Sequence, residues 1–385
     1  MLNSAPARPN ALPQKAGLIQ GPLSGDPDVP PIAAERRRGR GAASNAAGRF
    51  ESLQREVVDD GWATLDTLPA FKTEITIERP KTVITRNDSP DIGFDRSINP
   101  YRGCEHGCVY CFARPTHAYM GLSPGLDFES RLFVKEGAAA VLERELSRAN
   151  YQPKMLAIGT NTDPYQPIER QHRLMRGILE VLERANHPVG IVTKSALVAR
   201  DIDILQRMAQ KNLVKVAISI TTLDPVLARK LEPRAPTPAR RLETIRVLAA
   251  AGIPVAVMVA PIIPGINDAE IETILTRAQA FGASEAGYVM LRLPLEVKDL
   301  FREWLMENYP DKLRHVMSLV QSTRDGQDYD PAFGKRMTGT GPYAWMLGRR
   351  FEVASERLGL TKGRTKLRTD LFRSPQPQGA QLSLF

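Results

Sequence analysis

All three cysteines of the chain lie within eight residues, with the spacing C-x3-C-x2-C: Cys104, Cys108 and Cys111. Their thiolates can converge only if the backbone turns tightly, and Gly103 and Gly107 allow such a turn. Thiolates are soft ligands that select iron–sulfur clusters, zinc or copper. A closed zinc site needs four protein ligands, but the chain has no fourth cysteine, and His106 lies inside the loop in a poor position. A four-iron cluster with one iron open to a small molecule is therefore favoured over a zinc knob or a purely redox cluster.

The residues around this loop resemble a known family. Residues 99–114, which begin Asn-Pro-Tyr-Arg-Gly-Cys and carry Tyr110 just before the last cysteine, are similar to the radical S-adenosylmethionine (SAM) superfamily, in the branch related to spore photoproduct lyase. The resemblance implies a [4Fe-4S] cluster on the three cysteines, with SAM chelating the open iron. An electron from the cluster would cleave SAM to methionine and a 5′-deoxyadenosyl radical, which abstracts a hydrogen atom from the substrate.

Strand and helix patterns alternate along the middle of the chain, and this alternation predicts parallel β/α units. The expected strands are residues 97–102, 155–160, 189–193, 214–220, 253–260 and 286–293. The expected helices are residues 137–149, 168–186, 201–211, 225–231, 238–251, 268–281 and 297–308. Six units suit a partial (β/α)6 barrel of the TIM type, which is also the fold that the resemblance implies. In such a barrel the cysteine loop follows the first strand, at the carboxyl-end mouth where barrel enzymes place their chemistry.

The chain divides into five regions on composition and pattern. They are a disordered basic tail (1–45), an extension packed on the barrel (46–94), the barrel (95–308), a helical and β extension (309–372) and a flexible tail (373–385). Within the first extension, residues 73–78 alternate as a strand, and residues 81–85 are expected to pair with it. In the second, Trp345 and Phe351 are interpreted as core aromatic residues.

Polar residues just past the expected strands are candidates for SAM binding, because strand ends line the site of a barrel. After the second strand, Thr160, Thr162 and Asp163 offer two hydroxyls and a carboxylate that suit the SAM amino group. After the third strand, Lys194 suits the SAM carboxylate. A serine and an ion pair in the fourth unit suit the ribose or carboxylate, and Tyr110 suits the adenine. Taken alone, each of these residues also fits an ordinary turn, cap or surface role. The full set of candidates is Tyr110, Thr160, Thr162, Asp163, Lys194, Ser219, Glu232 and Arg234.

The sequence departs from spore photoproduct lyase in one respect. That enzyme is known for a cysteine past the second strand that returns a hydrogen atom, and the matching place here is near Thr160. The chain has no cysteine outside the loop, and a threonine O–H bond is too strong to replace a thiol. Tyr165 is the one nearby candidate for this catalytic role. The lyase reaction is therefore not carried over to this chain.

The excess positive charge of the chain lies at its two ends. The formal net charge is +9; residues 1–50 and residues 361–385 each carry a net +4. Basic ends suit a polyanion such as nucleic acid. Near the C-terminus four basic residues alternate so that an extended strand would place them on one face, able to follow phosphates: Lys362, Arg364, Lys366 and Arg368. Solvated tails and a charged edge strand are the alternatives.

The last five residues resemble the peptide by which bacterial proteins bind the sliding clamp. They read QLSLF, and the residues expected to dock are Gln381, Leu382, Leu384 and Phe385. An extended peptide on a free tail can bind in this way at some ordering cost. A merely frayed apolar end is the alternative.

These observations predict a cytoplasmic radical SAM enzyme with nucleic acid as its substrate, DNA repair being preferred. An electron donor such as flavodoxin or ferredoxin is implied. No apolar run reaches the ~18 residues of a membrane span, and no secretory signal is apparent. Two alternatives stay open: a radical SAM enzyme acting on a small metabolite or protein side chain, and a non-catalytic iron–sulfur adaptor on the clamp.

Overall fold

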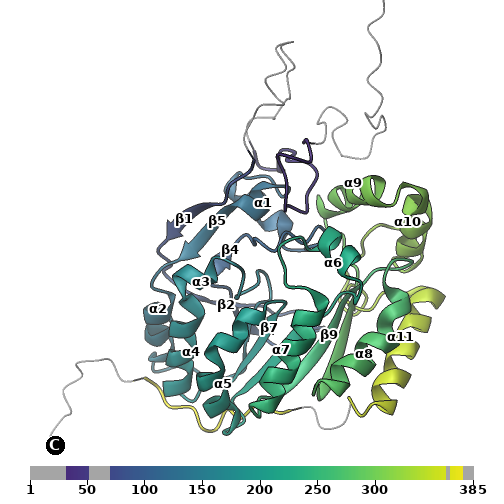
Figure 1. The fold of residues 1–385 in the computed structure, drawn as a ribbon. Helices are drawn as coiled ribbons and strands as arrows, with labels where there is room; N and C mark the ends of the chain where they lie inside the picture. Colours follow the sequence, from purple (N-terminus) through teal and green to yellow (C-terminus); the bar gives the residue numbers. More distant parts are fainter. Residues whose placement is uncertain (1–31, 52–69, 361–364, 376–385) are drawn as a thin grey trace, which may run out of the picture.

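The computed structural model describes residues 32–51, 70–360 and 365–375 (Figure 1). In these residues the main sheet has seven strands in the order β10-β9-β8-β7-β6-β3-β2, and a smaller sheet has the order β1-β5-β4. No helix of the described residues has the length and apolar character to span a bilayer. The strands are β1 Glu74–Glu78, β2 Ile84–Arg86, β3 Arg96–Ile98, β4 Tyr101–Arg102, β5 Arg131–Lys135, β6 Leu156–Ile158, β7 Val189–Thr193, β8 Val214–Ser219, β9 Val255–Ile262 and β10 Glu285–Met290.

Six strands of the main sheet run parallel, and each lies beside the next one in the chain: β3, β6, β7, β8, β9 and β10. Only β2 is antiparallel, paired with β3. This succession confirms the partial (β/α)6 barrel predicted from the repeat. The order ends at β10 and β2, which are not paired with each other in the described residues, so the barrel is open along one side.

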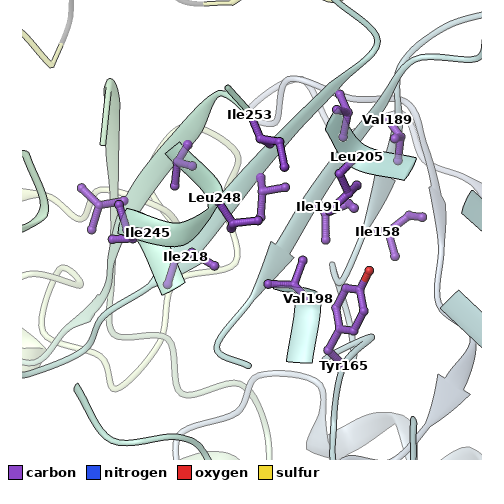
Figure 2. Close-up of a cluster of buried hydrophobic side chains, with 14 of the residues drawn as sticks. Ile158, Tyr165, Val189, Ile191, Val198, Leu205, Ile218, Ile245, Leu248 and Ile253 are labelled. Atoms are coloured by element: carbon purple, nitrogen blue, oxygen red, sulfur yellow. The ribbon is translucent and has the colours of Figure 1, made fainter. Parts of the chain in front are cut away.

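Helices α4, α5, α7 and α8 cover the outer face of the sheet, whereas α1, α6, α9 and α10 lie at its upper end in Figure 1. The helices are α1 Asp127–Ser130, α2 Ala138–Leu146, α3 Glu169–His172, α4 Leu174–Arg184, α5 Ile202–Ala209, α6 Pro225–Leu231, α7 Pro238–Ala250, α8 Ile271–Ala280, α9 Val297–Asn308, α10 Leu313–Ser322 and α11 Gly341–Arg357. The core lies between the covering helices and the outward-facing strand residues. Figure 2 shows part of it, with Ile191 and Ile218 of the sheet packed near Leu205 and Leu248 of the helices. These side chains are fully buried, and each contributes about 1.5–3 kcal/mol to folding.

The inner face of the sheet has a different character, which positions the site. Gly190, Ala217, Ala256 and Gly287 lie on the same face in successive strands, as the pairing register shows. All four are partly exposed, whereas the outward-facing neighbours in β7, β8 and β9 are buried. A closed barrel fills this space with branched side chains. Here the small residues leave an inner face that is partly exposed to solvent, and the side chain of Met258 lies against Gly287 on it.

The N-terminal strands do not pair as expected from sequence. The predicted pairing of residues 81–85 with residues 73–78 is wrong: β1 instead pairs in parallel with β5, and β2 pairs with β3. Strand β5 was not predicted from the sequence. Alternation identified the other two strands, but it carries no information about which strand lies beside which, because any half-buried strand has the same period of two.

Part of the predicted disordered tail is packed, which corrects the expectation for residues 32–45. Residues 36–45, called the strap below, run beside α1 (Figure 1). Within them Arg40, Ala42 and Ser44 are buried. Ser44 Oγ donates a hydrogen bond of 3.1 Å to Glu303 on α9, and Arg37 pairs with Glu307 of the same helix. Composition alone favours disorder here, because the strap has little apolar surface and is held by polar contacts.

Replacing Glu303 with glutamine is expected to stabilise the protein at pH 8. Burial raises the pKa of Glu303 to about 7, and the nearby Asp299 and Glu307 also raise it. A raised carboxyl pKa contributes stability below the unfolded value of about 4.3 and loses it as pH rises through 7. Glutamine does not ionise, so the variant should gain about 1–3 kcal/mol at pH 8.

Anaerobic urea unfolding at pH 8 and at pH 4.5 tests this, and the difference should shrink towards zero at the lower pH. Glu307→Gln, which removes a charge from the same helix at a more exposed position, serves as the matched control. An equal difference between Glu303→Gln and wild type at both pH values would contradict the assignment.

The described part of the C-terminal extension is helical, without the β part that the sequence predicted, and it packs against the last strand. Phe351 of α11 is buried against Tyr288 of β10, with ring centroids 4.7 Å apart, which confirms its place in the core. Trp345 was also expected in the core, but it is 69% exposed. The two residues are six positions apart, so on a helix they point about 120° away from each other and lie on different faces.

Candidate active site at the carboxyl ends of the strands

The cysteine loop follows β4 and is held by backbone hydrogen bonds. Cys104 N donates to Phe128 O, Val109 N donates to Leu231 O, and Cys111 N donates to Cys108 O. Gly103 and Gly107 have φ angles of +74° and +67°. The tight turn expected at these glycines is therefore present.

The three thiols fit the cluster that the sequence predicts. Cys104 and Cys108 are buried and Cys111 is partly exposed. Burial raises the pKa of all three, that of Cys108 to about 12, and each of the other two thiols further raises the pKa of Cys104. Three thiols grouped in this way lose their protons only when a strongly positive centre, such as a metal cluster, binds them.

The grouping also bears on the zinc alternative. Among residues 32–51, 70–360 and 365–375, no three His, Cys, Asp or Glu side chains are arranged to hold one metal ion. Three thiolates bound to one zinc at about 2.3 Å would lie within about 4 Å of one another. A [4Fe-4S] cluster does not require that convergence, because each thiolate binds a different iron.

A buried ion pair holds two backbone carbonyls of the cysteine loop in place. Arg114 donates from Nε to Cys108 O at 2.9 Å and from Nη2 to Gly107 O at 3.3 Å, and it pairs with Glu129. Both charged side chains are fully buried. A buried guanidinium that lacked its carboxylate would be costly, so Glu129 keeps Arg114, and through it the loop carbonyls, in place.

The same carboxylate binds the strap. Gly41 N and Ala42 N donate to the two oxygens of Glu129 at 2.8 and 2.9 Å. The backbone of the strap packs directly on the loop, because a Cβ atom at Gly41 would lie 1.8 Å from the carbonyl oxygen of Gly107. Only glycine fits such an approach. The strap and the cysteine loop therefore meet at one buried glutamate.

Asp163 lies beside the loop but is occupied by protein donors. Its carboxylate accepts hydrogen bonds of 2.7 Å from Thr193 Oγ1 and Lys194 N and lies 3.4 Å from His106 Nδ1. Burial alone would raise the pKa of Asp163, but His106 and the two donors outweigh burial and lower it to about 2. Asp163 thus links the loop after β7 to the cysteine loop. A contact between Asp163 and SAM would have to use the hydrogen-bonding capacity of the carboxylate that these donors do not occupy.

Glu232 and Tyr110 form a second occupied cluster. Glu232 accepts hydrogen bonds from Arg241, from the Tyr110 hydroxyl and from Thr221 Oγ1. Burial would raise the pKa of Glu232, but Arg241 and then Lys194 lower it to about 2. The structure therefore gives the hydroxyl of Tyr110 and the carboxylate of Glu232 protein partners, while the ring of Tyr110 remains next to the cysteines.

Lys194 is the predicted cofactor residue with the freest charge. Its Nζ lies 5.7 Å from the centroid of the Tyr110 ring. Burial would lower the pKa of Lys194, but Cys108 and Glu232 outweigh burial and raise it. It forms no ion pair within 4 Å in the described part of the chain. A cation placed beside the thiols in this way suits a carboxylate ligand.

The other predicted cofactor residues lie at the same end of the sheet. Thr160 accepts a hydrogen bond from Asn99, Thr162 donates to Tyr101 O, and Ser219 donates to Ala260 O. Arg234 lies 3.3 Å from Glu105, inside the cysteine loop. The strand ends thus gather all of these residues around the loop, but most of their polar atoms already have protein partners.

Tyr165 does not lie at this site, so its prediction as a catalytic residue is wrong. It is fully buried between the sheet and the helices, as Figure 2 shows, and its hydroxyl donates to Asp201 at 3.1 Å. Burial and Asp201 hold the pKa of Tyr165 well above its usual value. A hydroxyl in this position cannot reach a substrate on the inner face.

The predicted basic ribbon lies away from the cysteine loop where it is described. Lys366 and Arg368 are exposed, and Arg368 N donates to Asn212 O, just before β8 begins. This segment passes along the amino ends of the strands, below α5 in Figure 1, whereas the loop lies at their carboxyl ends. It is extended but not a strand. Lys362, Arg364 and the predicted clamp-binding residues Gln381, Leu382, Leu384 and Phe385 fall outside the described residues.

The residues that support the loop were not predicted from the sequence. Arg114 ends the motif string but had no predicted role, and neither had Glu129 or Arg241. Gln166 was missed as well: it accepts a hydrogen bond from Glu105 N and donates to Gly103 O. The one available signal in the sequence was Arg114, a basic residue close to the last cysteine. A charged residue that is buried in such a place needs a partner, so an acidic residue elsewhere in the chain could have been sought.

The chain is similar to families and proteins that are already known. A model of the radical SAM superfamily matches residues 98–278. The uncharacterized protein Rv2578c of Mycobacterium tuberculosis is 40% identical over 230 residues, which are 59% of this chain and 68% of that protein. The uncharacterized protein MJ0683 of Methanocaldococcus jannaschii is 27% identical over 240 residues, 62% of this chain and 85% of that protein.

The fold also resembles a solved structure. Spore photoproduct lyase complexed with dinucleoside spore photoproduct aligns with a TM-score of 0.55 and 16% sequence identity, covering 74% of this chain and 79% of that chain. At this identity the likeness concerns the fold.

Proposed function

Because the chain belongs to the radical SAM superfamily, we propose that it is the radical SAM enzyme of a nucleic-acid substrate, with DNA repair or modification as its reaction. Enzymes of this superfamily hold a [4Fe-4S] cluster and SAM, which together supply one-electron chemistry that ends in hydrogen-atom abstraction. In this chain Cys104, Cys108 and Cys111 would hold the cluster. Lys194 would bind the SAM carboxylate.

The observation that carries the proposal is a pair of cations near the three thiols that form no direct ion pair in the described residues. These cations are Lys194 and Arg292. Small residues leave the inner face of the sheet partly exposed to solvent. An anionic substrate suits these cations, and the basic ends of the chain suit the same class of substrate.

The likeness to spore photoproduct lyase supports the class of substrate but not the same reaction. A solved structure of that protein is complexed with a dinucleoside photoproduct. The present chain has no cysteine besides the three of the loop, so no protein thiol is left to return a hydrogen atom. We therefore propose chemistry that ends without a thiol hydrogen donor from this chain.

Deuterium transfer into 5′-deoxyadenosine tests the proposal. The reconstituted enzyme is incubated anaerobically with SAM and a chemical reductant, and with either DNA from cells grown in heavy water or a nucleic-acid-free extract of the same cells. Deuterium is expected in 5′-deoxyadenosine only with DNA. Label from the extract alone would replace the nucleic-acid proposal with the metabolite or side-chain alternative.

Two further parts of the proposal concern the setting of the reaction. We propose a cytoplasmic location with a small electron-transfer protein such as flavodoxin or ferredoxin as donor. The C-terminal QLSLF is proposed to bind the sliding clamp, which a binding assay with purified clamp and the variant L384A/F385A would test. Unchanged clamp binding by that variant would remove this part of the proposal.

A further inference from the structure

Arg292 occupies a distinctive position near the cysteine loop. It follows β10 by two residues, at the carboxyl end of the sixth parallel strand. Its guanidinium lies 4.5 Å from the centroid of the Phe112 ring, and Phe112 directly follows Cys111 in the chain. The Phe112 ring is 41% exposed. A cation and an aromatic face therefore stand together at the mouth, next to a cluster ligand.

The protein leaves the hydrogen-bonding capacity of Arg292 largely unused. One terminal nitrogen lies 3.3 Å from the Tyr329 hydroxyl, and the other lies 3.7 Å from the sulfur of Met337. Its Nε is buried and has no partner. A thioether is a weak acceptor and a tyrosine hydroxyl is neutral, so neither contact compensates the positive charge.

Other arginines around the site differ from Arg292 in this respect. Arg114 pairs with Glu129 and Arg241 pairs with Glu232. Among residues 32–51, 70–360 and 365–375, Arg292 has no such carboxylate within 4 Å. Arg114 and Arg241 are thus neutralised, whereas Arg292 and the buried Arg324 have no carboxylate partner in the described residues. Arg324 still donates to two backbone carbonyls, but Arg292 has no such acceptors, so its charge is left available.

A second arginine lies near Arg292, and the nearby carboxylates, including Asp328 with Arg302, are paired with other cations. Arg324 is buried nearby and donates to Leu291 O and Lys335 O. Burial lowers the pKa of Arg324, and Arg292 lowers it further as a like charge. The carboxylates on this side of the mouth are engaged by other cations: Asp91 by Arg336, and Asp325 and Asp330 by Lys335.

Two cations without a direct ion pair in the described residues thus flank the third cysteine. Lys194 lies over Tyr110 and Arg292 lies over Phe112, and these two aromatic residues are the chain neighbours of Cys111. The cations follow two different strands, the central strand β7 and the edge strand β10. One anion, the SAM carboxylate, suits Lys194. The second cation then requires a second anion, which the substrate would supply.

We propose that Arg292, with Phe112 and Tyr329 beside it, binds a phosphate of the substrate nucleic acid and holds the adjoining base against the Phe112 ring. A guanidinium offers phosphate a planar pair of donors, and an exposed aromatic ring gives a base a stacking surface without selecting its identity. This inference rests on the nucleic-acid substrate proposed above. It adds the residues that would place the reacting nucleotide beside the cysteine loop.

Binding of a fluorescein-labelled single-stranded oligodeoxynucleotide tests the inference, measured by anisotropy on the holoenzyme at several salt concentrations. Arg292→Gln is expected to weaken binding roughly tenfold and to reduce the slope of log K against log salt by about 0.7. Phe112→Leu is expected to weaken binding roughly fivefold with little change in slope. Arg246→Gln, on the outer face of α7, is the charge-matched control and should bind as wild type does.

SAM binding, measured by equilibrium dialysis on the same proteins, separates the two possible anions. The affinity of Arg292→Gln for SAM should equal that of wild type. A loss of SAM affinity with normal oligonucleotide binding would assign Arg292 to the cofactor and overturn the inference. Equal oligonucleotide binding by wild type, Arg292→Gln and Phe112→Leu would also overturn it. Failure of wild type to bind any oligonucleotide would instead remove the proposed function, and the inference with it.

Discussion

Replacement of Cys108 by alanine is expected to abolish 5′-deoxyadenosine formation, a loss of at least roughly 10³-fold. The chain has no other cysteine that could take the vacant position. Iron and sulfide per chain should fall to background, measured chemically and by absorbance near the cluster band. Cys108→Ser keeps the size of the side chain and should fail equally, because an alkoxide is a poor ligand for iron at neutral pH.

The apo form of this variant is expected to remain folded. Backbone hydrogen bonds and Arg114 hold the cysteine loop through contacts that do not involve the thiols. Removing one buried sulfur should cost about 1 kcal/mol, so apo Cys108→Ala and apo wild type should have similar unfolding curves. Cluster content close to that of wild type would contradict the assignment of Cys108 as a ligand.

Replacement of Glu129 by alanine is expected to destabilise the protein by about 3–5 kcal/mol. The change would leave the Arg114 guanidinium fully buried without its carboxylate, and it would remove the acceptor of Gly41 N and Ala42 N. We expect the iron content to fall as well, because the strap and the loop carbonyls lose their common anchor. Anaerobic urea unfolding and iron analysis measure the two effects.

A double-mutant cycle separates the charge from the packing. Glu129→Gln keeps an oxygen acceptor and should lose less stability than Glu129→Ala. Removing both charges, in Arg114→Met with Glu129→Met, should restore part of the stability, because no uncompensated charge is left buried. It should not restore the iron content, since Gly107 O and Cys108 O would still lack their donor. Full restoration of both properties would show that the pair has no positioning role.

The repeated pattern predicted the barrel well because each strand is apolar on its buried face and is followed by a helix. Residues 189–193, 225–231 and 297–308 were predicted with the bounds that the structure shows. Burial of outward-facing residues is a local property of the sequence, so the period reveals it. The pairing of β1 with β5 is not local, and no period encodes it.

The site was predicted in outline for a different reason. The cysteine motif is compact and specific, and strand ends in a parallel barrel necessarily gather at one mouth. What the sequence could not show is which polar atoms remain free. Asp163 and Glu232 look like ligands in the chain, yet donors from Thr193 and Arg241 occupy them in the fold. Nothing in the sequence singles out Arg292, because its proposed role depends on the absence of a carboxylate partner, and only the structure shows that absence.

The packing of Gly41 on the Gly107 carbonyl bears on how the protein is best produced. A shortened recombinant form that begins at residue 46, where the composition first suggests order, would cut away the strap rather than trim a loose end. Such a preparation would expose the side of the cysteine loop that the strap covers, and we expect it to lose the cluster. Its lack of activity would then reflect the truncation and not the enzyme. Expression vectors for this chain should therefore retain residues 36–45 and carry any purification tag upstream of them.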